Sequence, residues 1–230
     1  MSTTEVTDGP RPVSKRRRWR WLLGTGVALM AAGALLLGYI AWQYVGTNWV
    51  SHRHQAEVVD RLERGWESGQ ERVRTSYGDA EAVVRIPRFG ADYEMPVLEG
   101  TSDTALAAGF GHFDGSAGPG QVGNYALAAH RVTHGEPLRD MPDLEVGDQV
   151  VVETAGATYT YELVTAGDAL TVPFDTTWVV DPLPTNPDPQ GPMPPQDPGE
   201  RLLTMTTCSE LFHTDDRLVA FAVLTKTVRR

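Results

Sequence analysis

Three residues whose side chains could carry out acyl transfer stand at the ends of apolar runs in this sequence. Cys208, the single cysteine of the chain, follows the run 202–207, and Arg217 opens the next apolar run. Far upstream, His130 follows the run 125–129. Apolar and β-branched runs of this length are typical of strands. If these strands pair, a thiol, an imidazole and a guanidinium meet as a candidate nucleophile, acid–base and oxyanion clamp.

The chemistry of such a set would start at the thiol, which attacks a carbonyl carbon as the thiolate. An unperturbed cysteine is mostly protonated at neutral pH, so it needs a neighbour that takes its proton or stabilises its charge. His130 fits because an imidazole titrates near neutral pH. Arg217 stays charged and offers several N–H donors to a thiolate, a substrate carbonyl or an oxyanion. The first product would be a thioester.

Each of the three residues also has a purely structural interpretation. Cys208 could be a small core residue, His130 a hydrogen-bonded structural histidine and Arg217 a surface charge. A metal site is a further alternative, although the spacing of its ligands matches no usual zinc signature. Its ligands would be Cys208, His112, His134 and His213. The glycine-rich segment 109–123 lacks the G-K-[ST] that follows a phosphate cradle, so nothing predicts a cofactor.

The elements that must position these residues are predicted to be short strands. Apolar runs broken by glycine and proline begin at about Glu81 and indicate an all-β domain. The expected strands are 82–86, 93–97, 124–129, 149–153, 158–165, 178–180, 202–207 and 218–225. Segment 101–108 is expected to form a short helix with Ser102 or Asp103 near its cap, and 141–144 another helical turn.

The N-terminal part of the chain predicts a single membrane span. No Asp, Glu, Lys or Arg occurs between Arg20 and Arg53, and aromatic residues stand near both ends of this apolar window. A helix over 21–45 would be ~25 residues long, which at ~1.5 Å per residue is enough for a hydrocarbon core of ~30 Å. A cleaved signal peptide is the alternative, but its apolar core would be only ~7–15 residues long.

Charge predicts which side of the membrane each part occupies. The first 20 residues carry +4, from six Lys or Arg and two acids, which leaves −14 for the rest of a chain whose total is −10. The positive-inside rule places the N-terminus in the cytoplasm. We expect a basic tail over 1–20, the span over 21–45, a stalk or amphipathic helix over 46–80 and an extracellular catalytic domain over 81–230. Because the exported part of the chain carries a net charge of −14, it is not expected to bind nucleic acid.

Two other segments carry weaker predictions. Residues 55–75 have the pattern of an amphipathic helix interrupted at Gly65 and Gly69. Eight of the sixteen prolines lie between residues 182 and 198, which predicts a polyproline-rich loop. This loop directly precedes the run that ends at Cys208, so we expect it to overhang the same rim. A binding loop and an insertion without function are both open.

Motifs around the three chemical residues resemble those of sortases. T-M-T-T-C at 204–208, followed by Arg217, resembles the signature T-L-x-T-C … R, with Met205 in the place of Leu. The stretch P-G-Q-V-G-N-Y-A-L-A-A-H-R at 119–131 resembles P-G-x-x-G-N-x-x-x-x-G-H-R, with Ala129 in the place of Gly. The continuation V-T-H-G-E-P is similar to class E sortases of actinobacteria, which are high-GC Gram-positive bacteria. The resemblance covers about residues 82–225.

The resemblance implies an eight-stranded sortase-type β-barrel and a cysteine transpeptidase. Cys208 would attack the Thr–Gly bond of a C-terminal sorting signal similar to L-A-x-T-G on a secreted protein. His130 would protonate the leaving amine and then deprotonate the incoming one, while Arg217 would position the substrate and stabilise the oxyanion. Thr207, with Thr206 before it, would line the substrate groove.

The partners implied by the resemblance are amines at the cell surface. A lipid-linked peptidoglycan precursor would give covalent anchoring to the cell wall, and a pilin lysine would give polymerisation. No cofactor is implied. A thiol hydrolase of the same fold, in which water replaces the amine, is one alternative. A non-catalytic, membrane-anchored binding module that uses the acidic surface and the proline-rich loop is another.

Overall fold

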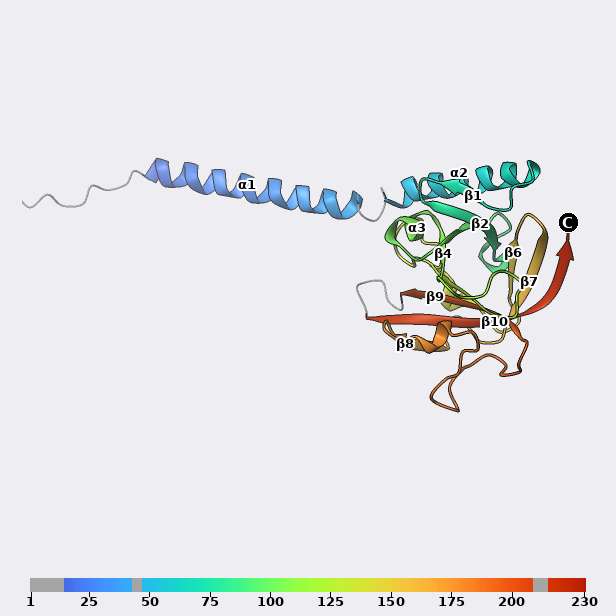
Figure 1. Cartoon of the computed structure of the whole chain (residues 1–230). Helices are drawn as coiled ribbons and strands as arrows, with labels where there is room; N and C mark the ends of the chain where they lie inside the picture. The colour runs from blue at the N-terminus through green and yellow to red at the C-terminus, as the bar shows by residue number, and fades with distance from the viewer. Residues whose placement is uncertain (1–14, 43–46, 209–214) are drawn as a thin grey trace, which may run out of the picture. The chain divides into compact units, whose positions relative to one another are not determined.

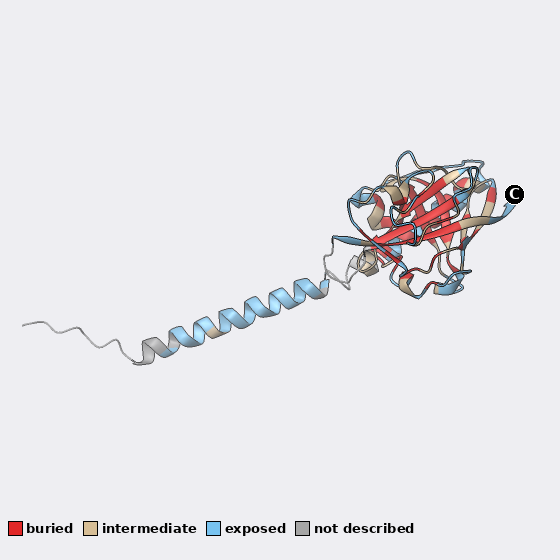
Figure 2. Cartoon of the chain, turned by 90° about the horizontal axis from the view of Figure 1, so that it is seen from below, coloured by how far each residue is buried: buried red, intermediate tan, exposed pale blue. Residues whose placement is uncertain are grey.

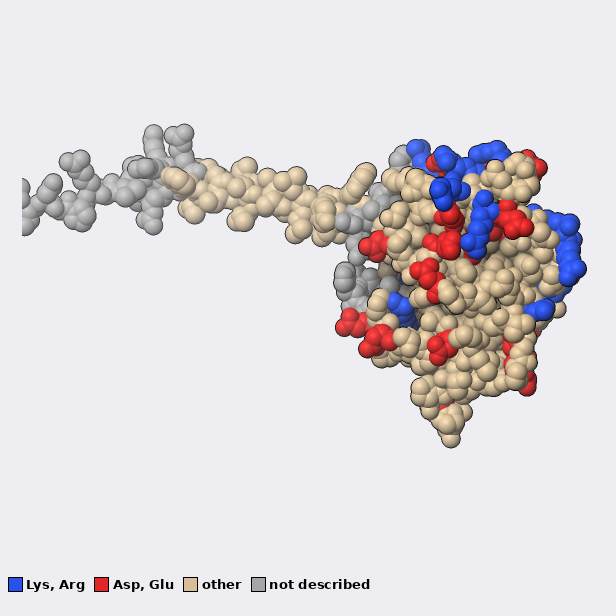
Figure 3. Space-filling view, in the orientation of Figure 1, with Lys and Arg blue, Asp and Glu red and all other residues tan. Residues whose placement is uncertain are grey.

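The computed structural model describes residues 15–42, 47–208 and 215–230 (Figure 1). The chain divides between residues 43 and 44 into two compact units. In the first unit, helix α1 (Lys15–Ala41) contains the apolar window Trp21–Ile40, with a mean hydropathy of 1.8. All of this window is unburied, and Figures 2 and 3 show it as exposed and free of charged side chains. By length and composition, it could cross a membrane.

Helix α2 (Thr47–Glu67) belongs to the second unit, where its apolar side packs on the sheet. Val58, Val59 and Leu62 are buried in one cluster with two residues of the neighbouring strand. The predicted amphipathic helix is therefore present, but it begins eight residues earlier than expected, continues through Gly65 and ends at Glu67. The expectation of helix up to residue 75 is wrong, because Val73–Thr75 is a strand, β1. A Cβ at Gly65 would lie 2.3 Å from the Val73 side chain, so this glycine allows a strand to approach the helix.

The second unit is built on a closed β-barrel, as the resemblance implied. Eight strands form a ring in the order β2-β3-β4-β5-β9-β10-β7-β6, which the β2–β6 pairing closes, while β1 adds to β2 and β8 to β10. Within the described residues the strands are β1 (Val73–Thr75), β2 (Gly78–Arg85), β3 (Met95–Glu99), β4 (Phe110–His112), β5 (Gly123–Ala128), β6 (Gln149–Glu153), β7 (Ala157–Leu163), β8 (Leu170–Pro173), β9 (Arg201–Cys208) and β10 (Asp216–Arg229).

Most of the expected elements coincide with observed ones. Seven of the eight expected strands overlap β2, β3, β5, β6, β7, β9 and β10. The expected helix is α3 (Asp103–Ala108), where Ser102 Oγ accepts a hydrogen bond from the Ala105 N–H, and the helical turn is η3 (Met141–Asp143). The short strands β1, β4 and β8 were not expected.

The expected strand over 178–180 is wrong, because this segment is the 3-10 helix η4 (Trp178–Val180). Its Val179 packs with Leu170, Val172 and two residues of β10 in a cluster outside the barrel core. The side-chain amide of Asn124 donates hydrogen bonds to the carbonyls of Val179 and Asp181 at 3.2 and 3.0 Å. A side chain therefore satisfies backbone groups that a strand would offer to a neighbouring strand.

Strands β9 and β10 are buried on both faces, which explains their continuous apolar sequence. Leu203 and Met205 point into the barrel core, together with Ala220 and Ala222 of β10. Val219 and Phe221, on the opposite face of β10, pack in the outer cluster with β8 and η4. Figure 2 shows buried strand segments in red in the middle of the barrel.

The proline-rich loop lies at the end of the barrel opposite to the one that was expected. The carbonyl of Asp181, at the start of the loop, binds Asn124, and the carbonyl of Glu200, at its end, binds the Gly123 N–H at 2.9 Å. Both contacts are at the first residues of β5, whereas His130 follows the last. Residues 181–200 form neither helix nor strand, and hydrogen bonds such as Thr185 Oγ1 to Gln196 Oε1 (2.9 Å) fold the loop on itself.

Candidate active site

The end of the parallel pair β5–β9 brings His130 and Cys208 to the same level of the barrel. Ala128 is the register partner of Thr206, and the Ala129 N–H donates to the Thr206 carbonyl at 3.1 Å. His130 and Cys208 each lie two residues beyond this Ala128–Thr206 pair. They therefore lie side by side at the ends of two adjacent strands of the barrel, although 78 positions separate them in the sequence.

The antiparallel pair β9–β10 adds the third predicted residue. Arg217 is the direct register partner of Cys208, so their Cα atoms face one another across the two strands. On its other side, Arg217 pairs with Val172 of β8. Cys208 thus stands between the strand that leads to His130 and the strand that begins near Arg217. The following residues 209–214, which include the acidic Glu210, lie outside the described residues.

Threonine hydroxyls fasten β9 to β5 immediately before this point. Thr207 Oγ1 donates to the Ala129 carbonyl at 2.8 Å, and Thr206 Oγ1 donates to the Leu127 carbonyl at 3.4 Å. Thr204, two residues earlier, donates to Asn124 Oδ1 at 2.8 Å. All three threonines are buried. The T-x-T-T pattern therefore fixes the strand ends that carry the thiol and the imidazole.

The Arg217 guanidinium lies over an aromatic ring. Its Cζ is 3.5 Å from the centroid of the Phe174 ring, which immediately follows β8. The Phe174 N–H also donates to the Asp215 carbonyl, just before β10. The Phe174 side chain remains 61% exposed. A flat ring under a guanidinium restricts the orientation of the guanidinium.

The His130 imidazole is half-buried and stacked on a second imidazole. The ring centroids of His130 and His134 are 4.6 Å apart and their planes are inclined by 26°. Burial, and next the stacked His134, lower the pKa of His130 to about 4, while Asp103 opposes them. His130 is therefore neutral at neutral pH and can accept a proton, as a general base does.

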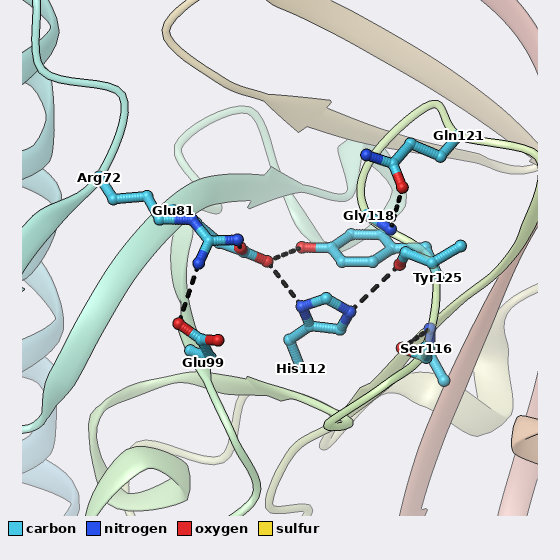
Figure 4. Close-up of polar contacts among 10 residues, drawn as sticks. Arg72, Glu81, Glu99, His112, Ser116, Gly118, Gln121 and Tyr125 are labelled. Atoms are coloured by element: carbon cyan, nitrogen blue, oxygen red, sulfur yellow. Dashed lines mark hydrogen bonds and ion pairs between the residues drawn. The ribbon is translucent and has the colours of Figure 1, made fainter.

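A second polar cluster lies inside the barrel and was not predicted from the sequence (Figure 4). Glu81 occupies a β-bulge in β2. Ala80 pairs with Leu98 and Ala82 pairs with Val97, so β2 advances by two residues while β3 advances by one, and Glu81 is the extra residue. Its carboxylate lies 2.9 Å from His112 Nδ1 and 2.8 Å from the Arg72 guanidinium.

The remaining contacts of this cluster complete its hydrogen bonding. The Tyr125 hydroxyl donates to Glu81 at 3.1 Å, and His112 Nε2 lies 3.1 Å from the Ala117 carbonyl. His112 thus has Glu81 and Ala117 as partners, and His134 stacks on His130. The alternative metal site would need His112 and His134 as ligands together with Cys208. Its fourth ligand, His213, lies outside the described residues.

Sequence reasoning missed two residues that touch the predicted set, Phe174 and His134. Phe174 follows a four-residue strand that no pattern indicated, and its contact is across the sheet. His134 was considered as a metal ligand and as part of the V-T-H-G-E-P stretch, but not as a neighbour of His130, although it follows His130 by four residues and their rings stack.

Comparisons with known proteins agree with this architecture. The sortase domain family matches residues 84–225, more than half of the chain. Sortase SrtE1 of Streptomyces coelicolor is 32% identical over 205 residues, which are 85% of this chain and 55% of that protein. The chain therefore spans about half the length of this relative.

Solved structures give the same result. The structure of sortase E from Streptomyces avermitilis superposes with a TM-score of 0.58 at 35% identity, over 68% of this chain and 93% of that chain. Sortase E1 from S. coelicolor, solved with a tripeptide in the active site, has a TM-score of 0.53 at 30% identity, over 69% and 94% of the two chains. The chain belongs to the sortase family, whose members are cysteine transpeptidases.

Proposed function

We propose that this chain is a membrane-anchored transpeptidase that cleaves an L-A-x-T-G-like sorting signal between Thr and Gly and joins the new carboxyl end to an amine of a cell-wall precursor. The observation that carries the proposal is the strand register, which puts the backbone positions of Cys208, His130 and Arg217 at one end of three adjacent strands. A nucleophile, a base and a fixed cation at one barrel end are the groups that acyl transfer requires.

The first half-reaction would form a thioester. The Cys208 proton passes to the neutral His130 imidazole, and the thiolate attacks the threonine carbonyl carbon. Arg217 donates hydrogen bonds to the resulting oxyanion. As the carbonyl re-forms, the Thr–Gly C–N bond breaks and the imidazolium gives its proton to the leaving glycine nitrogen. The lowered pKa of His130 favours this last proton transfer, because it makes the imidazolium a stronger acid.

The second half-reaction would reverse these roles. His130, neutral again, takes a proton from the incoming amine as that amine attacks the thioester. The C–S bond then breaks, and the thiolate recovers the proton from the imidazolium. The new amide joins the sorted protein to its acceptor, and no cofactor takes part in either step.

Phe174 would flank the substrate beside these groups, whereas Thr206 and Thr207, which are buried, would support the site from within rather than line a groove as expected. The two threonines fix the edge of β9 through bonds to β5, and the exposed Phe174 ring flanks Arg217. The tripeptide in the active site of the S. coelicolor sortase E1 supports a peptide substrate for this site.

The N-terminal helix would tether the catalytic unit to its substrates. The basic residues 15–20 stand immediately before the apolar window and favour a cytoplasmic N-terminus. The apolar window Trp21–Ile40 would span the membrane, and α2 with the barrel would lie outside the cell; the end of the expected span, 43–45, lies outside the described residues. A protein still held in the membrane and a lipid-linked precursor share this surface, which raises their effective concentration at the site.

The proposal is tested with the full-length chain in detergent micelles. A peptide containing Leu-Ala-x-Thr-Gly is incubated with a triglycine amine, and the products are identified by mass spectrometry. We expect cleavage after Thr and a new amide to triglycine. A peptide with Thr and Gly exchanged is the matched control and should stay intact. Free acid as the sole product, even with a lysine peptide as acceptor, would indicate a hydrolase instead.

An intact peptide, together with a Cys208 thiol that iodoacetamide fails to alkylate in the folded protein, would contradict the enzyme proposal. That result would favour the binding module. A new bond to the lysine peptide rather than to triglycine would assign the protein to pilin polymerisation. Each outcome therefore selects one of the functions that the sequence left open.

Phe174 provides a prediction of smaller size about substrate positioning. Phe174→Leu removes the ring beneath the Arg217 guanidinium, a contact that contributes about 0.5–1 kcal/mol at exposed sites. We expect kcat/KM for the peptide to fall about two- to fivefold, which is the same free energy expressed as a rate. Phe174→Tyr keeps the ring and should retain the wild-type value. Equal losses in both variants would show that the ring–guanidinium contact is not responsible.

A further inference from the structure

His134 lies in a turn whose backbone is held in an uncommon conformation. His134, Gly135 and Glu136 have φ values of 55°, 81° and 51°, so three consecutive residues occupy the left-handed region. For residues other than glycine, this conformation costs about 1–3 kcal/mol and persists where the surroundings impose it. Such strain is common at functional sites, and this turn follows His130 directly.

Helix α2 provides the contacts that impose this conformation. The Gln55 side-chain amide donates to the His134 carbonyl at 2.9 Å, and Asn48 Oδ1 accepts from the Gly135 N–H at 3.0 Å. A Cβ on Gly135 would lie 2.6 Å from both polar atoms of the Gln55 amide. The helix therefore binds both the carbonyl and the N–H of the peptide unit between His134 and Gly135. Glycine is needed at position 135 because a side chain there would collide with Gln55.

Further bonds fix the two sides of the turn. The Leu138 N–H donates to the His130 carbonyl at 3.0 Å, which closes the turn, and the Tyr93 hydroxyl donates to the Pro137 carbonyl at 2.7 Å. His134 Nδ1 lies 3.0 Å from Thr133 Oγ1, which restrains the rotation of the imidazole. The His134 ring is thus fixed by its backbone and by its own side-chain contact.

This fixed ring covers one face of the His130 imidazole. We propose that His134 is a positioning residue for His130, and that α2 holds the turn that sets it in place. The inference rests on the proposed function, in which His130 transfers protons to and from Cys208 and the two amines. A proton carrier must point at its partners within hydrogen-bond reach, so restricting the ring to one orientation favours each transfer.

The stacking also couples the charges of the two rings. Two imidazolium ions in contact repel one another, so protonation of one ring disfavours protonation of the other. Asp103, at the start of α3, is the charged group that acts on both rings, and it favours the protonated form of each. From α2, the neutral side chains of Asn48 and Gln55 contact this turn.

The test compares His134→Ala, which removes the ring, with His134→Phe, which keeps a flat ring without a charge. The full-length chain in detergent micelles is labelled with ¹³C-histidine, and the His130 titration is followed by NMR. In His134→Ala we expect the pKa of His130 to rise from about 4 toward the ordinary value of 6.5, because the ring is less buried and its neighbour is lost. In His134→Phe, which keeps the burial, the rise should be smaller.

Peptide turnover provides the second readout. In His134→Ala we expect the acid limb of the kcat/KM profile to move to higher pH together with the His130 titration. We expect kcat at its optimum to fall about tenfold, because the ring is less well oriented, with a smaller change in KM. His134→Phe should recover most of kcat. The exposed His52 of α2 gives the matched control, since His52→Ala should change neither readout.

An unchanged His130 titration in a His134→Ala protein whose thermal unfolding midpoint is that of the wild type would overturn the proposal. The NMR titration needs no turnover, so it decides the matter even if the peptide assay fails. A shifted titration without any peptide cleavage would therefore support the role of His134 and refute the substrate. If His134→Ala does not fold, the comparison of His134→Phe with the wild type carries the same test.

Discussion

Cys208→Ala is expected to abolish both cleavage of the Leu-Ala-x-Thr-Gly peptide and transfer to triglycine. The variant lacks the atom that forms the thioester, so the bound peptide has no covalent route to the acceptor amine. Loss of the nucleophile in a covalent catalyst lowers kcat by a factor of about 10⁴ or more. The measurement is the rate of product formation by mass spectrometry, with the full-length chain at equal concentrations of wild type and variant.

The variant should keep its fold, which separates this loss from unfolding. Cys208 is the last residue of β9, and the strand is held by Thr204, Thr206 and Thr207 and by the pairing with β10. We therefore expect the thermal unfolding midpoint of Cys208→Ala to lie close to that of the wild type. Residual turnover above about 1% of the wild-type rate would exceed the loss expected for a nucleophile and would assign the attack to another group.

The three chemical residues could be proposed from the sequence because each stands at one end of an apolar run. Runs such as 202–207 and 218–224 are long enough to be recognised as strands, and a strand ends where the apolar pattern does. Residue type then suggested the chemistry. The sequence order of the strands, however, does not reveal that β5 and β9 are parallel neighbours. That pairing connects segments about 80 residues apart and follows from closure of the whole barrel.

The missed features depend on contacts that local sequence does not encode. β4 is three residues long, and β8 is a four-residue edge strand that ends in proline, so neither gives a periodic pattern. Trp178–Val180 looks like a strand, but Asn124, from a distant strand, satisfies its backbone as a helical turn. The turn at His134 is similarly imposed by α2, whose contacting residues lie about 80 positions earlier.

Glu81 shows most clearly why a buried polar residue is hard to anticipate. In the run E-A-V-V it reads as a solvent-facing position at the start of a strand. The bulge at this residue turns its carboxylate into the barrel, where the residue is 5% exposed. His112 and Tyr125, which bind it there, come from β4 and β5. A buried carboxylate is tolerated here because cationic and hydrogen-bonding partners compensate for its lost hydration. These partners come from different parts of the chain, so the local sequence does not reveal them.

Glu81→Gln is expected to lower the free energy of unfolding by about 1–3 kcal/mol at neutral pH, as when buried hydrogen-bonding groups lose their charged partner. Burial by itself raises the pKa of Glu81, but the hydrogen bond and charge of His112, followed by Arg72 and Tyr125, bring it below its ordinary value of 4.5. The carboxylate is therefore charged when folded, and the amide of Gln leaves Arg72 and His112 without their anion.

The pH dependence of this difference follows from the direction of the pKa shift. A carboxyl whose pKa is lower in the folded state stabilises the fold at pH values above its unfolded pKa, and this contribution is lost as the pH falls through the folded value. The stability difference between wild type and Glu81→Gln should therefore be constant near neutral pH and shrink below about pH 4.5. Urea unfolding at a series of pH values measures it.

Glu99→Gln is the matched control, because Glu99 shares the same arginine at the surface. Arg72 lies 2.9 Å from Glu99 and 2.8 Å from Glu81, but the Glu99 side chain is 51% exposed. An exposed ion pair contributes at most about 1 kcal/mol, so Glu99→Gln should have little effect at any pH. Equal effects of the two substitutions would show that Arg72 alone sets the stability of this region. A large effect confined to Glu81 assigns the stability to the carboxylate that the β-bulge buries among β2, β4 and β5.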